Sequence, residues 1–163
     1  DYFEIIKKRE LVYEFLIPII ASVLFYAFIF KLIPVKEISI YVTNFMSLLV
    51  NVFAILVGFT ITAIAIFTSV DHKKIELLSK LNERMISGKY VTNYRFIYVN
   101  LIYSAFASIV MLIFTLSSFI LMLLIQERVL LALLIAGTLH VLLLSLRNVT
   151  TIYFTFANIK QSD

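Results

Sequence analysis

The side chains that could do chemistry in this chain are few. His72 and His140 are the only histidines, and there is no cysteine, which excludes disulfides, thiolate nucleophiles and cysteine-ligated metals. The two histidines are expected at different levels of the fold, so one chain offers no two-histidine metal site. Ser117 and Ser118 could be combined with His140 as in a hydrolase, but nothing in their setting supports it. No phosphate-binding glycine loop, GxSxG or HExxH motif occurs. We therefore expect no enzyme, no catalytic residue and no bound metal or cofactor.

Composition places most of the chain in a membrane. Of its 163 residues, 62% are hydrophobic and only 15% are charged, against about 25% charged residues in an ordinary globular protein. A chain this short could not cover so much apolar surface with its own polar residues, so lipid must be its main solvent. The net charge of +4 does not indicate nucleic acid as a direct partner. We predict one integral membrane domain over residues 1–163, in a bacterial inner membrane.

Four segments are long and apolar enough to cross the membrane as helices, since about 20 helical residues span the roughly 30 Å of hydrocarbon. The last two are separated only by Gln126, Glu127 and Arg128, which predicts a tight antiparallel hairpin. Transmembrane strands are not expected, because the apolar runs far exceed about 10 residues and do not alternate. The predicted fold is an all-α bundle of four transmembrane helices at about 11–33, 42–70, 96–125 and 129–157.

Basic residues predict the direction of these spans, because cytoplasmic loops carry an excess of lysine and arginine. The side with fewer basic residues has Lys31, Lys36 and Arg128. The other side has 11 of the 14, namely Lys7, Lys8, Arg9, Lys73, Lys74, Lys80, Arg84, Lys89, Arg95, Arg147 and Lys160. Both termini and the 71–95 loop are therefore expected in the cytoplasm.

The 71–95 loop has apolar residues near helical spacing, opposite basic ones, so it could continue the second helix and end near Ser87 and Gly88. These apolar residues are Ile75, Leu78, Leu81 and Met85. Such a basic amphipathic segment could lie against anionic lipid headgroups, or it could dock a cytoplasmic protein partner. In either interpretation the contact residues are Lys73, Lys74, Lys80, Arg84 and Lys89.

Small and polar residues form a stripe along the second span. They recur at intervals that place them on one side of a helix, and they are Asn44, Asn51, Ala54, Gly58, Thr62 and Ser69. The series Ala54, Gly58 and Thr62 would let two helix backbones approach closely in lipid. The third span has a matching stripe that includes Asn100, Ser104 and Ser108.

The two stripes allow three interpretations. The simplest is that they pack the four-helix bundle against itself. The second is self-association of several copies around a shared axis. The third is a polar line along a conducting path, although no acidic residue lies at mid-membrane to attract cations.

The spans contain the ionisable residues Glu14, His140 and Arg147, at positions where a charge is costly and marks a functional candidate. For His140, near the bilayer centre, the simplest interpretation is a neutral imidazole hydrogen-bonded to a neighbouring helix; the alternative is a response to protons or voltage. Arg147 lies seven residues further on the same face. It could reach the inner headgroups or pair with Glu14, and a Glu14–Arg147 pair is the buried contact that we predict. A helix kink is expected near Pro18.

The run GFTITAIAIFTSVDHKKIELLSK, from Gly58 to Lys80, is followed after a short gap by a tyrosine-rich third span. In this the chain resembles small four-span bacterial membrane proteins of anti-phage defence systems, of which the Kiwa membrane subunit is an example. The resemblance covers the architecture and this one segment. It implies a homo-oligomeric membrane sensor that works with a cytoplasmic effector protein, and no site residues follow from it.

The sequence therefore favours a non-enzymatic, oligomerising inner-membrane scaffold or sensor that presents its basic loop to a cytoplasmic partner. The alternative is an oligomeric channel or a holin-like effector that permeabilises the membrane. A pore must present its polar stripe to water, whereas a scaffold hides it between helices. Phenylalanines flank the third span's stripe and the fourth span is rich in Leu and Ile, which favours dry packing.

Overall fold

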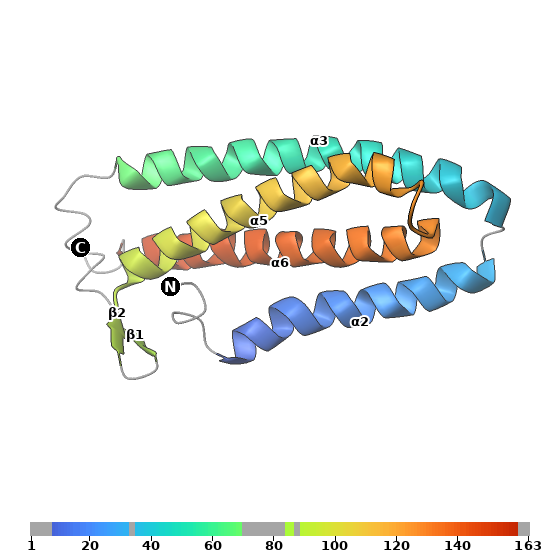
Figure 1. The fold of residues 1–163 in the computed structure, drawn as a ribbon. Helices are drawn as coiled ribbons and strands as arrows, with labels where there is room; N and C mark the ends of the chain where they lie inside the picture. Colours follow the sequence, from blue (N-terminus) through green and yellow to red (C-terminus); the bar gives the residue numbers. More distant parts are fainter. Residues whose placement is uncertain (1–7, 33–34, 70–83, 87–88, 160–163) are drawn as a thin grey trace.

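The computed structural model describes residues 8–32, 35–69, 84–86 and 89–159, most of them in four long helices (Figure 1). All four helices are long and apolar enough to cross a membrane, which confirms the prediction of four long apolar helices. The helices are α2 (Lys8–Leu32), α3 (Val35–Thr68), α5 (Asn93–Leu121) and α6 (Glu127–Ile159).

The helices pack in an order that differs from their order in the sequence. α3 packs mainly on α5, α5 on α6, and α6 on α2. As a result α2 and α3, which follow each other in the chain, lie on opposite flanks of the α5–α6 pair (Figure 1). We call the end of the bundle where α2 begins and α6 ends the hairpin end, and the end with the α5–α6 turn the turn end.

A short antiparallel hairpin before α5 corrects the prediction for the cytoplasmic loop. Strands β1 (Arg84–Ile86) and β2 (Lys89–Val91) pair with Met85 opposite Tyr90. The expected helix is therefore wrong at Met85, and the rest of the apolar series, Ile75 to Leu81, lies outside the described residues. The sequence signal for this hairpin was the two-residue Ser-Gly connection, a length and composition typical of hairpin turns.

Helix α5 starts and ends at identifiable signals. Thr92 is its N-cap, and the Thr92 Oγ1 accepts a hydrogen bond from the Arg95 N–H at 3.3 Å, which satisfies one of the free donors of the first turn. The helix ends at Leu121, four residues before the predicted limit, because 122–124 form the turn into α6. Leu123 and Leu124 lie in that turn and are 84% and 79% exposed. Because both residues are apolar, the sequence suggested a longer span.

The main core lies between α3, α5 and α6. Side chains from α3 and α6 fill it, and each is almost completely buried: Val42, Met46, Leu49, Phe53, Leu130, Leu134, Val141 and Leu144. At the hairpin end a smaller cluster joins Phe67 to Ile97 and Leu101. Among the described side chains of α2 only Glu14, Pro18 and Ser22 are buried. This spacing of four puts them on one side of α2, the side that meets α6.

Candidate functional site

Helix α3 has two opposite faces. The face toward α5 and α6 contains the core residues from Val42 to Phe53, and also Thr60, which is 3% exposed. The polar stripe lies on the other side and is exposed throughout, at Asn44, Asn51, Ala54, Gly58, Thr62 and Ser69. A Cβ atom on Gly58 would meet no atom within 4 Å. The interpretation that this stripe packs the bundle against itself is therefore wrong for α3.

The two hydroxyls of this stripe make hydrogen bonds, but its two side-chain amides do not. Thr62 donates to the Gly58 carbonyl at 2.8 Å, and Ser69 donates to the Ile66 carbonyl at 2.8 Å. Within the described part of the chain, the side-chain amides of Asn44 and Asn51 make no hydrogen bond. In an α3 that crosses a membrane, for which it is long and apolar enough, these amides would face lipid, which offers them no partner.

The stripe of α5 has the opposite orientation. Asn100, Ser104 and Ser108 are all at most 1% exposed, and so are Thr115 and Ser118. Ser108 donates to the Ser104 carbonyl at 2.8 Å, and Thr115 and Ser118 make the same kind of bond one turn back. Here the interpretation of packing within the bundle is right, because small buried side chains allow close helix approach.

A buried ion pair links α2 to α6. The Arg147 Nη1 donates to the Glu14 Oε1, so the predicted pair is present. Arg147 also donates through Nη2 to the Asn100 Oδ1 at 3.1 Å, and Asn148 donates to the Asn100 carbonyl at 3.4 Å. The side chains of Arg147 and Glu14 are 16% and 7% exposed. One polar network therefore joins three helices near the hairpin end.

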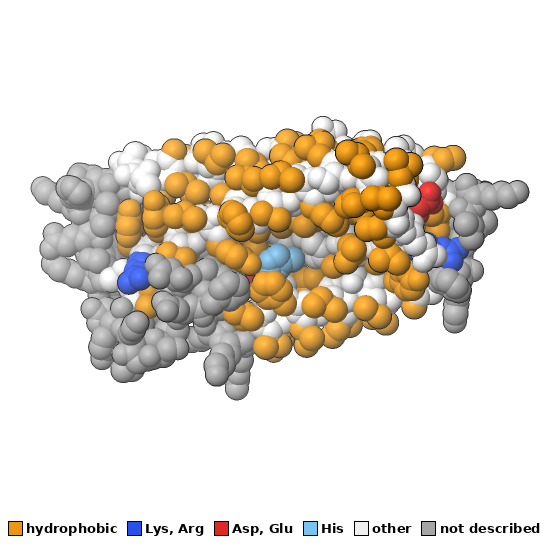
Figure 2. Space-filling view, viewed as in Figure 1, with side chains coloured by type: hydrophobic (Ala, Val, Ile, Leu, Met, Phe, Trp, Pro, Cys, Tyr) orange, Lys and Arg blue, Asp and Glu red, His pale blue; other side chains and the backbone are white. Residues whose placement is uncertain are grey.

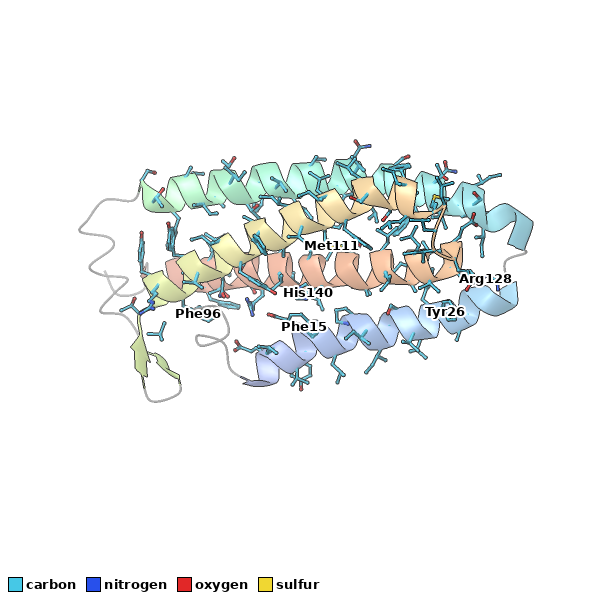
Figure 3. The ribbon with its side chains drawn as sticks, in the orientation of Figure 1. Phe15, Tyr26, Phe96, Met111, Arg128 and His140 are labelled. Atoms are coloured by element: carbon cyan, nitrogen blue, oxygen red, sulfur yellow. The ribbon has the colours of Figure 1, made fainter. Side chains whose placement is uncertain are left out.

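His140 belongs to the same region and reaches α2 through the backbone. Its Nδ1 lies 2.9 Å from the Glu14 carbonyl oxygen, and because a carbonyl only accepts, Nδ1 is the protonated nitrogen. The Nε2 then accepts from the Tyr103 hydroxyl, at 3.5 Å. The His140 ring lies 4.5 Å from that of Phe15, centre to centre, and the two approach each other between α6 and α2 (Figure 3). This matches the simplest interpretation from the sequence, a histidine bonded to a neighbouring helix.

The Glu14 carbonyl is available because of Pro18. In a helix the carbonyl of residue 14 would accept from the N–H of residue 18, but proline has no N–H. Pro18 lies inside α2 and is buried. The imidazole of His140 thus replaces the donor that Pro18 lacks. The sequence placed Glu14 and Pro18 one turn apart but gave no sign of this third residue.

The basic residues of the predicted contact surface are described only in part. Arg84 lies on β1 and Lys89 on β2, while Lys73, Lys74 and Lys80 lie outside the described residues. Sequence reasoning also missed Asn148 and Gly137. A Cβ on Gly137 would overlap the Sδ and Cε of Met111, which lies between α5 and α6 (Figure 3). A glycine inside an apolar helix, as at Gly137, was the available signal for this close approach.

Apolar side chains dominate the surface visible in Figure 2, and charged side chains gather near its two ends. This apolar surface, the four apolar helices of membrane-spanning length and the polar network enclosed among them define a class of protein. It is a multi-pass α-helical integral membrane protein. Compared with known proteins, the chain matches no family model, no curated protein and no solved structure.

Proposed function

We propose that the protein is a self-associating membrane scaffold or sensor whose copies meet through the polar stripe of α3. The observation that carries this proposal is the orientation of Asn44 and Asn51, exposed on the face opposite the core and without a hydrogen bond in the described chain. A polar group left unsatisfied in hydrocarbon costs several kcal/mol. Something other than lipid is therefore expected to cover this face.

A second copy of the chain fits the stripe by its chemistry. A side-chain amide both donates and accepts hydrogen bonds, so it is complementary to itself. Copies with the same topology run parallel, which places Asn51 of one copy at the level of Asn51 in the next. Asn44, Asn51 and Gly58 are seven residues apart, the repeat that keeps one seam of a left-handed coil in contact. Gly58 is then the point of closest approach.

Self-association would gather the basic loops of several copies on one side of the membrane. Arg84 and Lys89 lie on the two strands of the hairpin within this loop. We propose that the loop faces the cytoplasm, consistent with the bias of basic residues, and that it presents a positive surface to a protein partner. The setting of anti-phage defence is supported by the resemblance of the segment from Gly58 to Lys80.

An oligomeric channel is the second candidate, and one observation favours it. The exposed stripe runs from Asn44 to Ser69, 25 positions later, which is about 38 Å of helix, more than the roughly 30 Å of hydrocarbon. In a ring of several copies the same face could line an axis filled with water. Liposome flux of the purified protein, measured beside its native mass, separates the two. Strong ion leak from reconstituted oligomers would favour the channel function over the scaffold function.

Cysteine cross-linking tests self-association directly, because the natural chain has no cysteine. In native membranes treated with a lipid-soluble oxidant, N51C should form a disulfide-linked dimer. V110C is the matched control, since Val110 is a 45% exposed residue on α5 away from the stripe. Equal cross-linking of both variants at low expression would mean random collision and would overturn the proposal.

A tagged pull-down from native membranes tests the partner, with a variant in which the basic residues of 73–84 are reversed in charge. We expect the reversed variant to lose the protein partner while it keeps its N51C cross-link. A partner that stays bound after the charge reversal would show that the basic residues of 73–84 are not its docking surface.

A further inference from the structure

A groove of about 300 Å³ opens between α3 and α6 near the hairpin end of the bundle. Its walls are almost entirely apolar and come from three helices. The lining includes Phe59, Thr60, Leu101, Ser145, Asn148 and Tyr153. Phe59 and Tyr153 are 58% and 67% exposed, so the groove is reached from the lipid side of the bundle.

Two of the lining residues have polar atoms without a partner. Asn148 is only 6% exposed, and within the described residues its Oδ1 has no hydrogen bond; the same is true of the Ser145 Oγ. The Asn148 amide is oriented by its Nδ2, which donates to the Asn100 carbonyl at 3.4 Å. The remaining Oδ1 is an acceptor, so the group that completes it must donate. A buried acceptor left unsatisfied costs about 1–3 kcal/mol.

The level of Asn148 in the membrane narrows the class of ligand. Asn148 follows Glu127, the first residue of α6, by 21 positions, which is about 32 Å of helix. The hydrocarbon layer is about 30 Å thick, so this amide lies where acyl chains give way to headgroups. A ligand here needs an apolar tail to lie along Phe59 and Leu101 and a donor at its polar end.

We propose that the groove binds a phospholipid whose headgroup carries an N–H or O–H donor, with an acyl chain along the groove and the donor at Asn148 and Ser145. Phosphatidylethanolamine and phosphatidylglycerol meet this requirement, whereas phosphatidylcholine has no donor. The proposal goes beyond self-association and rests on different residues, since the groove uses Phe59 and Thr60 of α3 and none of its polar stripe.

Such a lipid would act on the buried network. A donor at the Asn148 Oδ1 fixes the amide orientation that lets Nδ2 bond to Asn100. Asn100 in turn accepts from Arg147, which pairs with Glu14 of α2. Side chains on α5 and α6 thereby connect the headgroup to the contact between α6 and α2. Through these contacts the lipid composition affects how α2 packs.

The test compares three lipids with identical acyl chains, added to the purified protein in detergent. Native mass spectrometry should find phosphatidylethanolamine and phosphatidylglycerol retained about three- to tenfold more strongly than phosphatidylcholine, the range expected for one or two net hydrogen bonds. Equal retention of all three lipids would overturn the proposal, and so would retention of none.

Variants assign the preference to its residues. N148L should abolish the headgroup preference and leave acyl-chain retention in place, and N51L, outside the groove, should keep the preference. V149W, which fills the groove from a lining position, should reduce retention of all three lipids. S145A provides a second reading if N148L does not fold, and it should at least halve the preference. A preference unchanged in both N148L and S145A would show that the lipids bind elsewhere.

Discussion

Pro18 of α2 and His140 of α6 are complementary across the helix interface. Pro18 deprives the Glu14 carbonyl of its intrahelical donor, and the His140 Nδ1 donates to that carbonyl at 2.9 Å. In a soluble protein water could fill such a gap, but inside a membrane the donor must come from the protein. The pair explains how α2 tolerates a buried proline and why it docks on α6 at this point.

A double-mutant cycle tests this complementarity. P18A returns the missing N–H to α2, so the Glu14 carbonyl no longer needs His140. Hydrogen bonds within membranes contribute about 0.6 kcal/mol on average and up to about 1.7 kcal/mol. We expect H140A to destabilise the natural sequence by at least about 0.6 kcal/mol, and to have a smaller effect in the P18A background. Unfolding in mixed micelles measures the four variants. If H140A has the same effect in both backgrounds, the two residues are not coupled.

The Glu14–Arg147 pair should matter most when only one partner is removed. R147Q removes the guanidinium that pairs with the buried carboxylate of Glu14, and breaking a buried pair in this way costs about 3–5 kcal/mol. The double variant E14Q/R147Q removes both charges and should recover most of that loss. Thermal unfolding in detergent is the measurement. A double variant as unstable as R147Q would contradict the assignment of the loss to an unpaired charge.

Gly58 separates protomer folding from association. A side chain at this position has open space around it, so G58L should leave the thermal stability of the protomer unchanged within about 0.5 kcal/mol. The same change should disrupt the oligomer through the bulk that it adds to the stripe. F59L is the control, since Phe59 is one residue away and lines the lipid groove instead. Native mass should shift for G58L alone; a shift for neither variant would argue against an interface at this stripe.

Gly137 should respond to the side chain at position 111. A methyl group at Gly137 would overlap the Sδ and Cε of Met111, which are the flexible end of that side chain and can shift at little cost. Because alanine favours a helix by about 1 kcal/mol over glycine, G137A should change the stability of the fold by less than about 1 kcal/mol. In the background of M111A no side-chain end has to move, and G137A should stabilise the fold by about 1 kcal/mol. The cycle is measured by thermal unfolding. Destabilisation by G137A in both backgrounds would place the effect elsewhere.

The sequence was informative about residues whose position follows from helical rise alone. The pairing of Glu14 with Arg147 could be predicted, because each lies a known number of residues from a span end and opposite charges at one level of a membrane pair with each other. The partners of Asn148 and Tyr103 could not be predicted, because they depend on how α5 is rotated against α6. The hairpin of β1 and β2 was missed because three-residue strands are too short for their alternation to outweigh a helical spacing.

The stripes on α3 and α5 mark the limit of the sequence most clearly. Periodicity determined that Asn44, Asn51 and Gly58 share one side of their helix, and that Asn100 and Ser104 share one side of theirs. Only the tertiary structure decided that the first set faces outward and the second inward. In water the hydrophobic effect would make that choice, but lipid is as apolar as a helix interior. The direction of each stripe therefore depends on how the side chains of α3, α5 and α6 fit together.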